Sequence, residues 1–71
     1  MILYTKENCS ACAIVKTLLD NKGVEYEIED REEIYLPISR ENKIFQMPFA
    51  EIEGKIYDLG ALRTWISLLE E

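Results

Sequence analysis

Apolar and polar residues follow one another along the first part of the chain in patterns that predict a strand, a helix and a second strand. The apolar run at residues 2–5 is bounded by polar residues, as is typical of a short strand. From Ser10 onward, apolar residues recur at the spacing of one helical face until Asn-Lys-Gly at residues 21–23 supplies a stop signal. Residues 24–29 then alternate between apolar and acidic side chains, the period of a half-buried strand. These elements predict a βαβ unit whose two strands lie parallel.

The pattern is weaker beyond residue 30 and becomes regular again near residue 49. Within residues 30–46 a weak helical periodicity predicts a short helix between residues 37 and 43. Residues 49–52 and 55–57 are two short strand candidates. The acid-glycine pair Glu53-Gly54 separates them, and pairs of this kind make tight hairpin turns. We therefore expect the two strands to pair antiparallel.

The last part of the chain predicts a closing helix. Leu59, Leu62, Ile66 and Leu69 recur at helical spacing, and Asp58 precedes them as a candidate N-cap. The predicted order is therefore β-α-β-α-β-β-α, with no internal repeat, low-complexity stretch or linker. The sequence thus predicts an α/β fold in one domain that covers residues 1–71.

Composition removes several classes of function. The 71 residues include no histidine, which excludes Ser/His/Asp triads, Cys/His thiol hydrolases and histidine-ligated metal sites. Fourteen acidic residues against eight basic ones leave a net charge of −6, which argues against a nucleic-acid partner. The longest apolar run, residues 11–15, is too short to cross a membrane, and the N-terminus does not resemble a secretion signal. We expect a cytoplasmic monomer.

The strongest candidate for chemistry is the pair of cysteines in Cys9-Ser10-Ala11-Cys12. The pair lies where the first strand leads into the first helix. A sulfur at the start of a helix is close to free backbone N–H groups and to the positive end of the helix dipole, which stabilise a thiolate. The spacing places Cys12 one turn behind Cys9, close enough to attack a mixed disulfide formed there. We predict that Cys9 attacks a disulfide and that Cys12 resolves the intermediate.

Other interpretations of these residues stay open. Two thiolates fill half of a four-ligand metal or iron–sulfur site, so a dimer or bound glutathione must then supply the rest. An inert structural pair is a further alternative. Nearby, Lys6 either lowers the thiol pKa or meets a substrate carboxylate, or it is a solvated surface charge. The hydroxyl of Ser10 either reaches the sulfur of Cys9 or caps the helix.

A non-catalytic interaction domain is a third class of function. The acidic residues within 25–33 either dock a basic partner or form a solvated strand edge that discourages aggregation. A set of large apolar side chains either lines a docking groove or fills the core. We expect the core for all of them except Met47: the set is Phe45, Met47, Phe49, Tyr57 and Trp65.

Taken together, these motifs resemble the glutaredoxins. The resemblance rests on Ile-Leu-Tyr-Thr-Lys ahead of Cys-x-x-Cys at residues 2–12, Lys-Gly-Val at 22–24, Met47-Pro48, and Glu-Gly-Lys at 53–55. The chain is also similar to the short glutaredoxin-like hydrogen donors of ribonucleotide reductase, which take electrons from thioredoxin reductase. The resemblance implies a thioredoxin-like fold with a four-stranded mixed sheet flanked by helices. It further implies a cis peptide bond before Pro48.

The resemblance also implies a substrate site and a set of partners. Residues at the positions of Lys6, Met47 and Pro48 bind substrate or glutathione in the family. Asp58 stands where a Gly-Gly pair usually begins, and it either substitutes in substrate binding or only caps the last helix. The chain lacks that Gly-Gly, and Ala61-Leu62 offers no carboxylate for the glutathione amine. We expect a dithiol oxidoreductase without a tightly bound cofactor or metal. Its expected partners are protein disulfides, glutathione or thioredoxin reductase as electron donor, and ribonucleotide reductase as a candidate substrate.

Overall fold

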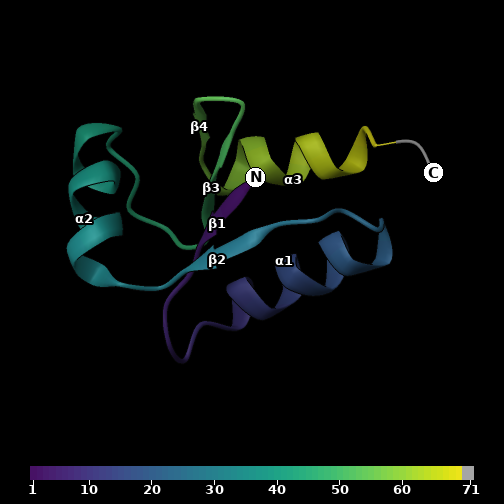
Figure 1. The fold of residues 1–71 in the computed structure, drawn as a ribbon, viewed down its shortest axis with the longest axis horizontal. Coiled ribbons are helices and arrows are strands. Elements are labelled where there is room, and N and C mark those ends of the chain that lie inside the picture. Colours follow the sequence, from purple (N-terminus) through teal and green to yellow (C-terminus); the bar gives the residue numbers. More distant parts are fainter. Residues whose placement is uncertain (70–71) are drawn as a thin grey trace.

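The computed structural model describes residues 1–69, so residues 70–71 of the predicted domain lie outside the described part. Within residues 1–69 the elements follow the predicted order (Figure 1). They are β1 (Ile2–Tyr4), α1 (Ser10–Asn21), β2 (Glu27–Glu29), α2 (Glu32–Glu41), β3 (Phe49–Ile52), β4 (Lys55–Tyr57) and α3 (Leu59–Ser67). Among these residues, no helix combines the length and the apolar character that a membrane span requires.

The four strands form one mixed sheet in the order β2-β1-β3-β4. β1 pairs with β2 in parallel and with β3 antiparallel, and β3 pairs with β4 antiparallel. The register places Leu3 between Ile28 on one side and Ala50 on the other. Because side chains alternate along a strand, the register decides which residues share a face of the sheet.

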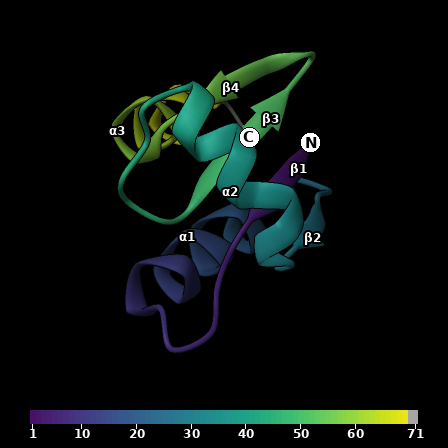
Figure 2. The ribbon, with the colours of Figure 1, turned by 90° about the vertical axis from the view of Figure 1, so that its left-hand side faces the viewer.

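Helices pack against both faces of this sheet. On one face, Leu3 and Ala50 belong to a core cluster with buried side chains of α1 and α3, which lie next to each other (Figures 1 and 2). On the other face, Tyr4 and Phe49 pack against Tyr35 of α2. The rings of Tyr4 and Phe49 are stacked, with centroids 4.7 Å apart. The fold is therefore a three-layer α/β arrangement with the sheet in the middle.

Two predicted local signals are confirmed. Glu53 and Gly54 form the two-residue turn between β3 and β4, both with positive φ, at 51° and 80°. This conformation is typical of the tight hairpin turn that an acid-glycine pair favours. Asp58 is the N-cap of α3, because its Oδ1 atom accepts a hydrogen bond of 2.8 Å from the backbone N–H of Ala61. The helix ends at Ser67, so Leu69 lies beyond it.

The prediction for the middle helix is wrong in its boundaries. α2 begins at Glu32, five residues before the predicted start, and includes Pro37 as an internal residue. Glu32 and Glu33 occupy the first turn, where the positive end of the helix dipole favours carboxylates. Pro37 lacks the N–H that would bond the carbonyl of Glu33, and the helix tolerates this single loss. The predicted helix therefore lacks the first five residues of α2.

The predicted second strand is longer than the observed one. β2 covers Glu27–Glu29 only, while Val24 and Tyr26 are half-buried against the core without being part of the strand. Ile28 is 49% exposed, although the alternating pattern predicted burial. β2 is the edge strand of the sheet, and Ile28 belongs to neither core cluster, so the side chain stays partly exposed at the margin of the packed face.

Candidate dithiol site

Cys9 is the N-cap residue of α1, with an extended backbone conformation. Its Sγ atom accepts a hydrogen bond of 3.1 Å from the backbone N–H of Cys12. The sulfur thus occupies the place that a serine or aspartate oxygen takes in an ordinary cap. A backbone N–H donated to sulfur, together with the helix dipole, stabilises negative charge on that sulfur. Ser10, the first residue of α1, is exposed and is not the cap.

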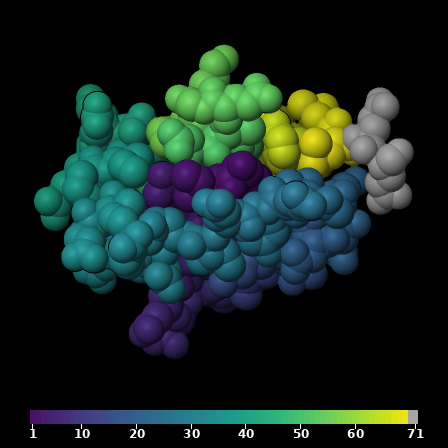
Figure 3. All heavy atoms as spheres, in the orientation of Figure 1, coloured from purple at the N-terminus to yellow at the C-terminus, as the bar shows by residue number. Residues whose placement is uncertain are grey.

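The two cysteines are joined in a disulfide, with their Cα atoms 5.2 Å apart. Their environments differ. Cys12 is 2% exposed and faces the core, whereas Cys9 is partly exposed. The loop that joins β1 to α1 and ends at Cys9 projects from the rest of the molecule (Figures 1 and 3). Cys9 is therefore the more exposed of the two cysteines, and Cys12 is almost completely buried.

Asn8 directly precedes the N-cap and has a positive φ of 55°. Few residues other than glycine adopt this left-handed conformation, and asparagine is among those that tolerate it best. The turn at Asn8 brings the chain from the loop into the first turn of α1. The side-chain direction of Cys9 thus depends on the backbone of its neighbour, which the sequence analysis did not identify. The sequence signal for this positioning role is an asparagine directly before the predicted start of a helix.

Met47 and Pro48 lie beside the dithiol. A cis peptide bond joins them, as the resemblance implies, and Pro48 is buried immediately before β3. The Sγ atom of Cys9 lies 3.9 Å from the carbonyl oxygen of Met47. In the disulfide this sulfur carries no hydrogen, so the approach is a contact and not a hydrogen bond. The structure therefore brings Cys9, Cys12, Met47 and Pro48 together.

Lys6 lies on the α2 side of this group. It is exposed and lines a groove of about 310 Å³ with Tyr35, Arg40, Phe45 and Met47 among other residues. It also borders a second, more acidic hollow lined with Glu7, Asp30, Glu32 and Tyr35. Burial, and to a smaller extent the negative charge of Glu32, raise the pKa of Tyr35 above its ordinary value of 10.0.

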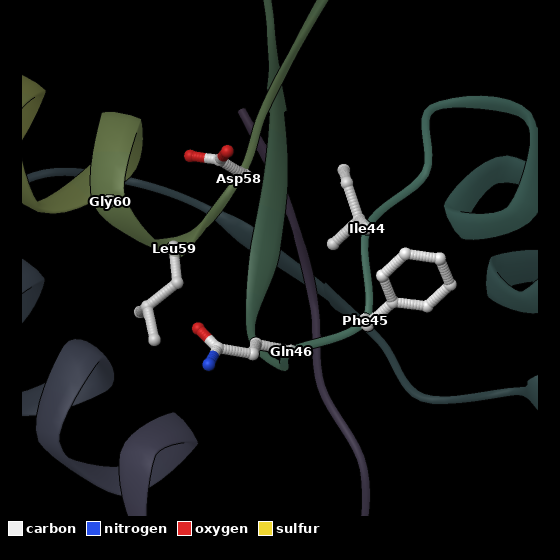
Figure 4. Close-up of a pocket in the computed structure, with 6 residues that line it drawn as sticks. All are labelled: Ile44, Phe45, Gln46, Asp58, Leu59 and Gly60. Atoms are coloured by element: carbon white, nitrogen blue, oxygen red, sulfur yellow. The ribbon is translucent and has the colours of Figure 1, made fainter.

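Asp58 lines a different pocket, of about 300 Å³ (Figure 4). This pocket lies between the loop that carries Ile44, Phe45 and Gln46 and the first turn of α3 with Leu59 and Gly60. Lys6 is not among the residues that line this pocket. Ile44 and Phe45 line both the Asp58 pocket and the groove of Lys6 and Arg40.

The prediction that Phe45 is a core residue is wrong. Its side chain is 90% exposed, while Phe49 is fully buried and Tyr57 and Trp65 are half-buried. Phe45 lies in the irregular segment between α2 and β3, where no element covers it. Apolar character alone does not distinguish Phe45 from Phe49, because both are large aromatic residues and only packing decides which of them is covered.

The described residues contain no group of three or more Cys, His, Asp or Glu side chains placed to hold a metal ion. A metal or iron–sulfur site at Cys9 and Cys12 would need further ligands from a second molecule or from bound glutathione.

A parallel βαβ unit, an antiparallel hairpin, a final helix and a Cys-x-x-Cys pair at the start of α1 define a thioredoxin-like α/β protein with a dithiol site. The family model described as Glutaredoxin matches residues 1–53, which is well over half of the chain. The protein belongs to the glutaredoxin family, and this membership supports a role in thiol redox chemistry. A comparison with curated proteins found no match.

Proposed function

We propose that the protein is a dithiol-disulfide oxidoreductase that reduces protein disulfides or glutathione mixed disulfides. The observation that carries the proposal is the asymmetry of the cysteine pair. Cys9 is accessible and accepts the N–H of Cys12, while Cys12 is 2% exposed. This arrangement suits one attacking thiolate and one resolving thiol.

The reaction proceeds in two exchanges. The thiolate of Cys9 attacks one sulfur of the substrate disulfide, a Cys9–substrate disulfide forms, and the second substrate sulfur leaves as a thiolate that takes up a proton. Cys12 then loses its proton and attacks the sulfur of Cys9. The Cys9–Cys12 disulfide forms and the first substrate sulfur leaves as a thiol. Two electrons pass from the dithiol to the substrate, and the protein ends in the oxidised form that the structure shows.

The neighbouring residues have proposed roles in binding. The backbone of Met47, next to Pro48, pairs with the main chain of the substrate, as extended segments commonly pair. Support comes from the 3.9 Å contact between the Met47 carbonyl and the sulfur of Cys9. Lys6 attracts an anionic group into the groove that it shares with Arg40. Asp58 lines the neighbouring pocket of about 300 Å³, which shares Ile44 and Phe45 with this groove, and is a candidate contact for substrate there.

The protein needs an external reductant to complete the cycle, for which glutathione and thioredoxin reductase are the two candidates. Turnover of a small disulfide is measured with either glutathione and its reductase or thioredoxin reductase alone. Sustained turnover in one arm supports the function and identifies the donor. Lack of turnover in both arms, with the protein folded, contradicts the proposal.

A further inference from the structure

The outer edge of β2 carries backbone groups that the sheet does not pair. Within the described part of the chain β2 pairs with β1 alone, and it lies at the front of the view in Figure 1. The N–H of Glu27 donates a hydrogen bond of 3.0 Å to the carbonyl of Met1, and the carbonyl of Glu29 accepts another of 3.0 Å. Because alternate residues of a strand bond to the same neighbour, the N–H and C=O of Ile28 point away from β1.

The side chains of β2 do not make this edge repellent to every other strand. Ile28 is 49% exposed in the middle of the strand and shares a face of the sheet with Leu3, its register partner. Edges that only discourage aggregation commonly carry charge or proline in place of an exposed β-branched residue. Glu27 and Glu29 lie on the opposite face, because side chains alternate along a strand. The edge therefore offers an apolar position between two acidic ones.

The start of β2 borders a hollow with free carboxylates. Glu25 and Glu27 are both exposed and line this hollow, which measures about 430 Å³. Among residues 1–69 the only ion pair joins Arg31 to Glu29, at 2.9 Å. The carboxylates of Glu25 and Glu27 are therefore available to a basic side chain from outside.

A second hollow, of about 350 Å³, lies beyond the other end of β2. Three carboxylates and one ammonium group line it with Tyr35: the charged residues are Lys6, Glu7, Asp30 and Glu32. Tyr35 is 5% exposed, and its hydroxyl takes part in none of the side-chain hydrogen bonds within the described residues. A phenol oxygen accepts hydrogen bonds from ammonium and guanidinium groups. Both hollows thus suit a basic side chain, and β2 lies between them.

We propose that the outer edge of β2 binds an extended segment of a partner polypeptide in which basic residues alternate with apolar ones. The segment adds a strand through the N–H and C=O of Ile28. Its apolar residue packs beside Ile28, and its basic residues face Glu27 and the two hollows. A second copy of the chain fits poorly, because pairing β2 with β2 places glutamates opposite glutamates. The inference goes beyond the proposed function and does not depend on the cysteines.

The test titrates three peptides into the oxidised protein and follows its amide chemical shifts. The peptides are Ac-Lys-Val-Lys-Val-Lys-NH2, Ac-Lys-Ser-Lys-Ser-Lys-NH2 and Ac-Glu-Val-Glu-Val-Glu-NH2. The lysine-valine peptide is expected to give saturable shifts at residues 25–30, the lysine-serine peptide weaker ones and the glutamate peptide none. The inference is overturned if the lysine-valine peptide gives no such shifts, if its shifts lie elsewhere, or if the two lysine peptides bind equally.

Charge reversal tests the acidic part of the surface. Glu27→Lys should weaken binding of the lysine-valine peptide about fivefold, because it replaces a favourable cross-strand pair by a like-charge pair. Glu41→Lys is the matched control, since it changes the net charge equally at the exposed far end of α2, about 13 Å along the helix from Glu32. At physiological ionic strength, where screening acts over about 8 Å, this control should keep the wild-type affinity. An equal loss in both variants overturns the inference.

A proline tests the strand addition itself. Ile28→Pro removes the outward N–H but leaves the hydrogen bonds of Glu27 and Glu29 to β1, and proline is tolerated at such edge positions. It should abolish the shifts, whereas Ile28→Val, which keeps the N–H, should retain them. Full affinity in Ile28→Pro, with the far-ultraviolet spectrum of wild type, contradicts pairing at this edge. Sedimentation is expected to show a monomer, and a dimer that Ile28→Pro dissociates would assign the edge to a second copy and overturn the inference.

Discussion

The backbone N–H of Cys12 donates a hydrogen bond of 3.1 Å to the Sγ atom of Cys9. One residue therefore has two parts in the proposed reaction, because its amide donates to the sulfur of Cys9 and its own thiol is the proposed resolving group. The amide belongs to the first turn of α1, so this hydrogen bond to the sulfur of Cys9 is available whenever the helix is folded. Histidine is absent from the chain, so the proposed reaction relies on backbone N–H groups and the helix dipole to stabilise the thiolate of Cys9.

The two cysteines should behave differently when each is changed to serine. Cys9→Ser should lose at least about 99% of disulfide reductase activity, because the buried Cys12 cannot reach an external disulfide. Cys12→Ser should accumulate a mixed disulfide at Cys9, which intact-mass spectrometry detects after incubation with an oxidised substrate. Retained activity in Cys9→Ser, or a mixed disulfide on Cys12, would reverse the proposed roles.

Asn8 should control the placement of Cys9 through its positive φ of 55°. Asn8→Val forces a β-branched residue into this conformation and should cost about 1–3 kcal/mol of unfolding free energy. It should also slow alkylation of Cys9 by iodoacetamide at neutral pH, measured in the Cys12→Ser background. Asn8→Gly should retain the alkylation rate. The control is Asn21→Val, at the exposed end of α1, which should leave the rate unchanged, and a slow Asn8→Gly would refute the positioning role.

Asp58 should be needed for stability through its N-cap hydrogen bond to Ala61. Asp58→Ala should lower the unfolding free energy by about 1 kcal/mol, whereas Asp58→Asn keeps a capping oxygen and should lose much less. Urea denaturation measures both. The same pair tests a binding role, because Asp58→Asn removes the negative charge but retains the cap. A change in KM for a glutathione mixed disulfide in Asp58→Asn would show that the carboxylate contacts substrate.

Three tyrosines should make the fold sensitive to alkali. Burial raises the pKa of Tyr4, with Glu51 and Glu29 adding to it, and burial also raises the pKa of Tyr26 and of Tyr35. The folded state thus favours the neutral phenols. Their contribution to stability is complete below the ordinary pKa of 10.0 and is lost as the pH rises through the raised values.

Urea unfolding at a series of pH values above 9, together with the ultraviolet absorbance of tyrosinate, measures this loss. Tyr26 donates a hydrogen bond of 3.0 Å to Asp20, which also favours its neutral form. Tyr26→Phe should therefore make the alkaline decrease in stability shallower. A tyrosinate titration complete below pH 10 in the folded protein would contradict the expected direction.

The features that the sequence predicted correctly depend on residues close together in the chain. The start of α1 at Ser10, the turn at Glu53-Gly54 and the cap at Asp58 each involve contacts within a few residues. The prediction for α2 starts too late, because the periodicity before Pro37 is weak and proline is disfavoured inside a helix, whereas the packing of α2 against the sheet stabilises the longer helix.

By itself, the sequence determined the order of the elements, the placement of the cysteine pair at a helix start and the exclusion of histidine chemistry. These follow from local periodicity, capping and composition. Only the tertiary structure decided that Cys12 is buried while Cys9 is accessible, that Met47 contacts Cys9 and that Phe45 is exposed. Such properties depend on which elements pack together across long sequence separations. The identity of a single apolar residue does not indicate whether another element of the fold will cover its side chain.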